Sequence, residues 1–184
     1  MPRYCLLTIG CQMNEADGRY VAAQLERRGY APVARPRDAD VVVLNTCVVR
    51  QQAEDRAYAI LAEIEGLRAR RPELRVALMG CLVGTRPAPD LARRFPFVDV
   101  FLPPSDFGPL LRLLDGEPAA DEGGGVSGLR RADAERETAI RAAIAAADAL
   151  RPPSRRNDPI AHLPVVLGCS QACTYCVIPY RRGR

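Results

Sequence analysis

Three short apolar runs, each followed within two residues by a cysteine, most constrain what this chain can fold into. The runs YCLLTI at 4–9, DVVVLN at 40–45 and RVALM at 75–79 predict buried strands. Helical apolar patterns fill the intervals at 15–28 and 50–70. Strands that alternate with helices of this length form right-handed βαβ units. We therefore predict an α/β fold with a mainly parallel sheet and flanking helices.

Shorter patterns extend this first domain to residue 115. They predict helices at 88–94 and 106–114 and a strand at 98–102. On the long helix, one side should face the core, and it carries Ala57, Ile60, Leu61, Ile64 and Leu67. Pro72 closes that helix.

The composition changes after residue 115. We interpret 116–162 as a linker, because it begins rich in Gly and small polar residues and contains an Ala-rich helical stretch at 130–150. The apolar run LPVVLG, which begins at Leu163, predicts a new strand. Residues 163–184 therefore form the start of a second domain.

Composition narrows the class of protein. No apolar run approaches the ~20 residues that cross a bilayer, and the first residues lack a secretory signal pattern, so we expect a cytoplasmic protein away from membranes. The net charge of +4 is compatible with nucleic acid, although an Arg-only set of basic residues also arises from genomic base composition. In a reducing compartment, seven cysteines indicate metal ligands or redox thiols rather than disulfides.

One set of cysteines follows the three strands. Cys11, Cys47 and Cys81 each lie just past a strand end, and the carboxyl ends of parallel strands share one edge of a sheet. We expect the three to converge there and hold a metal centre, although buried cysteines can also pack as small hydrophobes. Three thiolates suit a 4Fe-4S cluster with one open iron better than structural zinc, which takes four closed ligands.

A second set is compact in sequence. Cys169, Cys173 and Cys176 form Cys-x-x-x-Cys-x-x-Cys, a spacing that lets one loop hold three corners of a 4Fe-4S cluster. A zinc knuckle is the alternative, but its fourth ligand is missing. Tyr175 precedes the last cysteine, where its ring could stack on the base of a cofactor.

Two further residues have simple structural explanations. Cys5 lies inside the first predicted strand and should pack in the core. His162 lies in a Pro-rich stretch and should be solvated, with a role as a fourth ligand as the alternative. We assign no acid–base catalytic side chain.

At these cysteines the chain resembles the methylthiotransferase family of radical-SAM enzymes. The resemblance rests on GCQMN at 10–14, LNTCVVR at 44–50, MGC at 79–81 and GCSQACTYCVIPYRRG at 168–183. The first and last motifs are most similar to the branch that acts on isopentenyl-adenosine in tRNA. Sister branches modify threonylcarbamoyl-adenosine in tRNA or an aspartate of a ribosomal protein.

The resemblance implies two 4Fe-4S clusters and S-adenosylmethionine as cofactors. Cys169, Cys173 and Cys176 would hold the cluster that binds S-adenosylmethionine and generates the 5′-deoxyadenosyl radical. Cys11, Cys47 and Cys81 would hold the auxiliary cluster that carries the sulfur. The methylthio group would be transferred to C2 of the adenine in the tRNA anticodon loop. Partners would be tRNA and an electron donor such as flavodoxin or ferredoxin, with the protein a monomer.

The resemblance also implies a longer protein. A radical-SAM βα barrel and a small RNA-binding domain would follow residue 184, so we expect the chain alone to be an inactive fragment. A non-catalytic iron–sulfur carrier is the alternative from a different class. A plain nucleotide-binding α/β module is less consistent, because it leaves the Cys169–Cys176 spacing unexplained and no Gly-x-Gly-x-x-Gly follows the first strand.

Overall fold

The computed structural model describes residues 1–184 except 86–88, 105, 117–164, 167, 172 and 184. In chain order, the elements are β1 (Arg3–Thr8), α1 (Gln12–Arg27), β2 (Ala31–Pro32), the 3-10 helix η1 (Pro36–Asp38), β3 (Val41–Thr46), α2 (Gln51–Arg70), β4 (Arg75–Gly80), α3 (Pro89–Arg94), β5 (Val100–Leu102), α4 (Gly108–Leu114) and α6 (Ile178–Arg181). The predicted Ala-rich helix at 130–150 and His162 lie outside the described residues.

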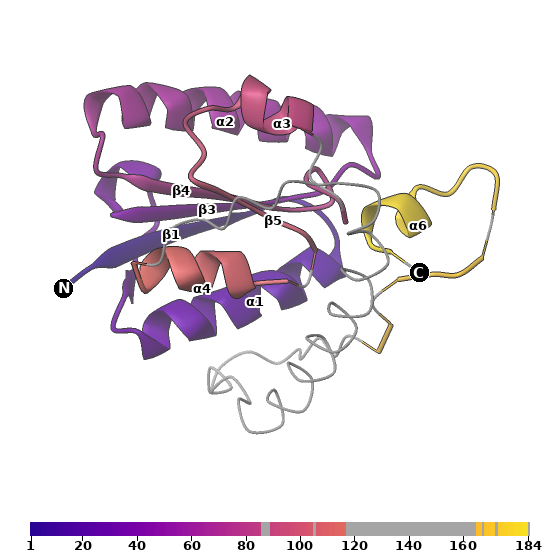
Figure 1. The fold of residues 1–184 in the computed structure, drawn as a ribbon, viewed down its shortest axis with the longest axis horizontal. Coiled ribbons are helices and arrows are strands. Elements are labelled where there is room, and N and C mark those ends of the chain that lie inside the picture. Colours follow the sequence, from indigo (N-terminus) through magenta and orange to yellow (C-terminus); the bar gives the residue numbers. More distant parts are fainter. Residues whose placement is uncertain (86–88, 105, 117–164, 167, 172, 184) are drawn as a thin grey trace.

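All five strands are parallel and lie in the order β2-β1-β3-β4-β5. The connections therefore run one way from β1 to β2 and the other way from β3 to β5. Helices α1 and α4 cover one face of the sheet, and α2 and α3 cover the other (Figure 1). This arrangement confirms the predicted α/β fold. It also places a topological switch point between β1 and β3, the position where open parallel sheets bind ligands.

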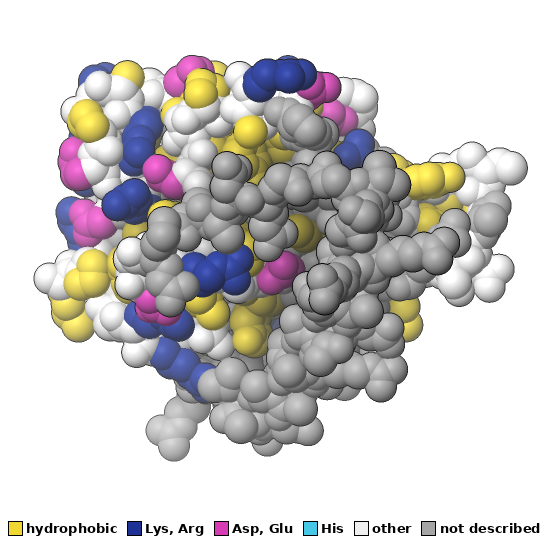
Figure 2. Space-filling view, viewed as in Figure 1, with side chains coloured by type: hydrophobic (Ala, Val, Ile, Leu, Met, Phe, Trp, Pro, Cys, Tyr) yellow, Lys and Arg dark blue, Asp and Glu magenta, His cyan; other side chains and the backbone are white. Residues whose placement is uncertain are grey.

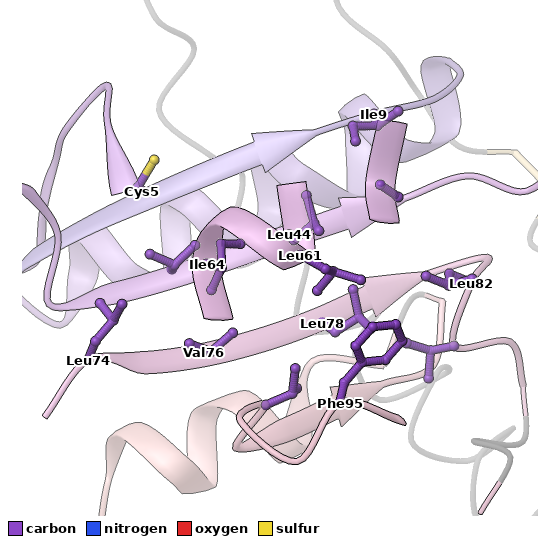
Figure 3. Packing of buried hydrophobic residues seen from close by; sticks show 14 of the residues in the cluster. Cys5, Ile9, Leu44, Leu61, Ile64, Leu74, Val76, Leu78, Leu82 and Phe95 are labelled. Atoms are coloured by element: carbon purple, nitrogen blue, oxygen red, sulfur yellow. The ribbon is translucent and has the colours of Figure 1, made fainter. Parts of the chain in front are cut away.

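The sheet separates two apolar cores. Every residue of β3 is buried, as the β-branched run predicts, and its side chains alternate between the two faces. Val42 and Leu44 belong to one cluster with Leu61 and Ile64 of α2, whereas Val43 packs on the opposite face. Figure 3 shows Leu44 beside Leu61 and Ile64. Burial on both faces holds the strands in one register and so fixes where their carboxyl ends lie.

Cys5 belongs to the core on the α2 face. Its side chain is buried in the same cluster as Leu74 and Val76 (Figure 3). Burial and the nearby carboxylate of Asp38 raise the pKa of the Cys5 thiol to about 11. The prediction that Cys5 packs as a small hydrophobic residue is confirmed.

Helix α1 begins three residues earlier than the apolar pattern predicts. Cys11 is its N-cap, and the Cys11 N–H donates to the side-chain oxygen of Asn14 across 3.4 Å. Glu15 N–H donates to the carbonyl oxygen of Cys11, which closes the first turn. Apolar periodicity cannot detect a polar first turn, so the start at residue 15 was wrong. The predicted stop at Gly29 is confirmed, since this glycine follows the helix with φ +81°.

The segment after 164 differs from the prediction. Val165 and Val166 are exposed and form no strand, because no described strand lies beside them to complete a ladder. The four-residue helix α6, which was not predicted, follows instead. It lies beyond the carboxyl ends of the strands (Figure 1).

One face of the molecule carries both signs of charge. On this face, Arg and acidic side chains of the described residues are interspersed (Figure 2). None of the described helices combines the length and the apolar character that crossing a bilayer requires.

Candidate functional site

The three strand-end cysteines lie in loops at one edge of the sheet. Cys11 follows β1, Cys47 follows β3 and Cys81 follows β4, and these three strands are adjacent in the sheet. Cys11 is exposed, whereas Cys47 and Cys81 are only 4% and 1% exposed. The site therefore has two buried thiols and one open to solvent, at the switch point of the sheet.

A buried asparagine joins the first loop to the second. The Asn14 side-chain amide donates to Asn45 Oδ1 across 2.9 Å and to the carbonyl oxygen of Thr46 across 2.8 Å. Asn45 Nδ2 donates back to the carbonyl oxygen of Asn14 across 2.7 Å. Both asparagines are fully buried. Buried amides need such partners, so this pairing fixes the start of α1 against the end of β3.

Thr46 joins the second loop to the third. Its hydroxyl donates to the carbonyl oxygen of Met79 across 2.6 Å and accepts from the N–H of Leu82 across 3.3 Å. Its carbonyl oxygen accepts from the N–H of Cys81 across 2.9 Å as well as from Asn14. Thr46, the residue before Cys47, thus fixes the segment 79–82 that carries Cys81.

Two glycines let the loops approach closely. At Gly10, with φ +147°, a β-carbon would lie 2.7 Å from the β-carbon of Cys47 and 2.6 Å from Asn14 Oδ1. At Gly80, with φ +94°, it would press on the carbonyl oxygen of Thr46 and lie 2.7 Å from Asn45 Oδ1. Any side chain at these two positions would push the cysteine loops apart.

The three thiols share one electrostatic environment. Burial raises the pKa of Cys81, and the thiols of Cys47 and Cys11 raise it further. Arg182 acts in the opposite direction, through its charge and a hydrogen bond from its side chain. Deprotonation of Cys81 is therefore opposed by its neighbours and assisted by one arginine from the far end of the chain.

That arginine is held in a buried ion pair. Arg182 Nη1 and Nη2 both donate to Asp17 Oδ2 across 3.3 Å. The side chains are 4% and 6% exposed. Burial lowers the pKa of Arg182, but Asp17 and Cys81 raise it by more, so the guanidinium stays charged.

The second cysteine set lies in the segment that carries Arg182. Cys173 is exposed, and Cys169 and Cys176 are partly exposed. The Cys176 N–H donates to the carbonyl oxygen of Cys173 across 3.2 Å, which turns the loop. Tyr175 is 91% exposed and its ring contacts solvent. This set is compact and open, in contrast to the enclosed first set.

No three His, Cys, Asp or Glu side chains of the described residues are arranged to hold a single metal ion. A 4Fe-4S cluster sets a different requirement, because each cysteine binds its own iron at a separate corner. The donors in each set are three thiols, as such a cluster needs. The buried arginine beside Cys81 supplies positive charge against the thiolates. The donor chemistry therefore fits a cluster better than an isolated ion.

Sequence reasoning assigned no role to Asn14, Thr46, Asp17 or Arg182. Three of them lie inside the motifs GCQMN, LNTCVVR and GCSQACTYCVIPYRRG. A polar residue within a cysteine motif was the available signal for these. Asp17 gave none, because an acidic residue in the first turns of a helix is ordinary.

The chain is similar in sequence to one protein family and to several named proteins. The model of the family described as "Uncharacterized protein family UPF0004" matches residues 3–103. The chain is 36% identical over 177 residues to the tRNA-2-methylthio-N(6)-dimethylallyladenosine synthase of Rhodopirellula baltica, an alignment that covers 96% of this chain and 36% of the relative. Proteins of the same name from Dictyoglomus thermophilum and Dichelobacter nodosus are 33% and 37% identical, over 100% and 96% of this chain. They are covered over 39% and 36% of their own length.

Proposed function

Because the chain belongs to protein family UPF0004, with relatives named tRNA-2-methylthio-N(6)-dimethylallyladenosine synthase, we propose that it supplies the N-terminal part of a tRNA methylthiotransferase. The reaction would place a methylthio group on C2 of isopentenyl-adenosine, which is the dimethylallyladenosine of those names. The observation that carries the proposal is the gathering of three cysteine loops at one sheet edge through Thr46. The chain spans about a third of the relatives' length, so the activity is proposed for a protein of that length.

In this proposal, Cys11, Cys47 and Cys81 bind the auxiliary 4Fe-4S cluster. Two buried thiols and one exposed thiol would seat the cluster against the protein with one side toward solvent. Three cysteine ligands leave the fourth iron open to an exchangeable ligand. The backbone network through Thr46 would hold the thiols in place before the cluster binds.

We propose that Cys169, Cys173 and Cys176 bind the second cluster and that Tyr175 stacks on the adenine of S-adenosylmethionine. When bound, this cluster and S-adenosylmethionine supply the one-electron chemistry that an aromatic C–H bond requires. The exposure of Cys173 and Tyr175 supports a loop that receives a cofactor rather than packing in a core. An electron donor such as flavodoxin or ferredoxin would reduce the cluster.

The proposed setting follows from the substrate. A tRNA substrate places the protein in the cytoplasm, and we expect it to act as a monomer. On the face shown in Figure 2, Arg and acidic side chains are interspersed, so this face offers tRNA little concentrated positive potential. A non-catalytic cluster carrier would use the same six cysteines, but Tyr175 would then have no stacking partner.

A chimera tests the proposal. In the chimera, residues 1–184 would replace the matching part of the Rhodopirellula baltica relative. The chimera and the 184-residue chain would each be reconstituted without oxygen. Each would receive a low-potential reductant, S-adenosylmethionine, a sulfur source and isopentenylated tRNA, and the digested RNA would be searched by mass spectrometry for the methylthio nucleoside. We expect the chimera to form it. The 184-residue chain alone should not, because its second cysteine loop is open, and a radical formed there would take hydrogen from the wrong donor.

The control is the chimera with Cys11, Cys47 and Cys81 replaced by Ala, which should form no methylthio nucleoside but still cleave S-adenosylmethionine. An unmodified chimera that holds both clusters and yet leaves tRNA unmodified would refute the proposal. Matched tRNA carrying threonylcarbamoyl-adenosine, and the ribosomal protein substrate, would identify a sister branch if either were modified instead.

A further inference from the structure

The ion pair of Asp17 with Arg182 joins parts of the chain that are 165 residues apart. Asp17 lies on α1, one turn beyond Asn14, and Arg182 follows directly after α6. Both side chains are more than nine-tenths buried. Removing two charges from water costs free energy that their attraction only partly returns, so such pairs fix geometry more than they add stability. The pair therefore specifies where the C-terminal segment lies.

Arg182 also closes the base of the second cysteine loop. Its N–H donates to the carbonyl oxygen of Ile178 across 2.8 Å, which completes the turn of α6. The next residue, Gly183, accepts from the N–H of Cys169 across 3.0 Å. The two ends of the loop thus meet beside Arg182. Fixing the position of the Arg182 side chain therefore also fixes the position of the loop.

The same guanidinium lies at the first cysteine set. Its partner Asp17 lies on α1, the helix whose N-cap is Cys11. A second contact supports the docking, since Thr85 Oγ1 donates to the carbonyl oxygen of Tyr180 across 3.4 Å. Both cysteine sets therefore meet at one edge of the sheet, with one arginine between them.

We propose that Arg182 is a positioning residue that holds the Cys169–Cys176 loop against the Cys81 end of the sheet edge. Its planar fork engages Asp17 through both Nη atoms, which holds its charge beside α1 at the Cys11 end of the sheet edge. In the proposed function, on which this part of the inference rests, the arginine sets the distance between the two clusters. It also stabilises the auxiliary cluster's negative charge.

Hydrogen exchange of the iron-free 184-residue chain tests the docking without any cluster. In Arg182→Ala, the amides of Cys169 and Arg182 should exchange about tenfold faster or more, as expected from losing charged hydrogen bonds. Asp17→Asn should act in the same direction, and Arg182→Lys should restore part of the protection because it keeps the charge. The matched control is Arg181→Ala, which removes the same charge one residue away and should leave exchange unchanged. Amides of β3 report that the sheet stays folded in every variant.

A spectroscopic measurement then tests the link to the first cysteine set. In a chain with Cys169, Cys173 and Cys176 replaced by Ala, only the auxiliary cluster can form. Arg182→Ala should shift the electron paramagnetic resonance spectrum of the reduced cluster, and Arg181→Ala should leave it unchanged.

Three outcomes are decisive. Equal exchange in Arg182→Ala and Arg181→Ala would overturn the docking role. Identical spectra in these two variants would overturn the charge role at the cluster. If no variant binds iron, the proposed function fails, while the exchange measurement still decides whether Arg182 positions the loop.

Discussion

The side-chain amide of Asn14 donates to the backbone carbonyl oxygen of Thr46 across 2.8 Å, and this bond joins the first turn of α1 to the end of β3. The same carbonyl oxygen accepts from Cys81 N–H. Through these hydrogen bonds, the Thr46 carbonyl oxygen joins three loops, each of which carries a cysteine. The relative positions of these three loops are therefore set by hydrogen bonds at the sheet edge.

Replacing Asn14 with Ala should lower the free energy of unfolding by about 2 kcal/mol or more. The substitution leaves Asn45 Oδ1 and the Thr46 carbonyl oxygen buried without this donor, and an unsatisfied buried group costs about 1–3 kcal/mol. Urea denaturation of the iron-free chain measures the change. Gln12→Ala, at an exposed position of the same helix, is the control and should change stability by less than about 0.5 kcal/mol.

Gly80→Ala should destabilise the protein by more than Gly29→Ala. Both glycines have positive φ, so both substitutions carry a backbone cost of about 1–2 kcal/mol. At Gly29 nothing lies within 4 Å of the added β-carbon, whereas at Gly80 it presses on the backbone of Thr46. The difference between the two unfolding free energies isolates that contact. Equal losses would show that the third loop moves freely to accommodate the methyl group.

Iron content should separate the two cysteine sets. After anaerobic reconstitution we expect about eight irons per chain, if both sets hold 4Fe-4S clusters. Replacing Cys11, Cys47 and Cys81 with Ala should remove about half, and replacing Cys169, Cys173 and Cys176 should remove the other half. Cys5→Ala is the matched control and should keep all the iron. Complete loss with either triple variant would indicate one shared cluster.

Cys5 should resist alkylation while the protein is folded. Burial and Asp38 raise its pKa from 9.0 to about 11, so at about pH 8 it is neutral as well as inaccessible. Iodoacetamide labelling of the iron-free chain, read by peptide mass spectrometry, should modify the exposed Cys173 and spare Cys5. Labelling of both at similar rates without denaturant would contradict the assigned burial.

The raised pKa of Cys5 also gives a pH dependence. Below pH 9.0 the thiol is protonated in both the folded and the unfolded chain, so its contribution to stability is complete. Between pH 9.0 and about 11 the unfolded chain ionises first, so stability falls as pH rises. Denaturation series across this range should show a smaller loss in Cys5→Ala than in the unaltered chain. Parallel losses would mean that other groups determine the alkaline decrease.

The sequence by itself determined the parallel α/β fold and the edge at which the first cysteines gather. Short β-branched runs such as Val41–Thr46 that alternate with helices favour central parallel strands, and a cysteine just past each such strand then lies at the carboxyl edge. Periodicity also identified the buried side of α2, where Ala57, Leu61 and Ile64 are buried. Short β-branched runs form strands only where neighbouring strands complete the sheet, and Val165 and Val166, which have no described strand beside them, form none.

Only the tertiary structure decided how that edge is held together. The pairing of Asn14 with Asn45 and of Asp17 with Arg182 joins residues whose chain separation gives no periodic signal. Each is a polar contact that exists because burial leaves its groups no water to bind. Which buried groups face one another is set by the reversal in connection direction between β1 and β3, and that is a property of the assembled sheet rather than of any one segment.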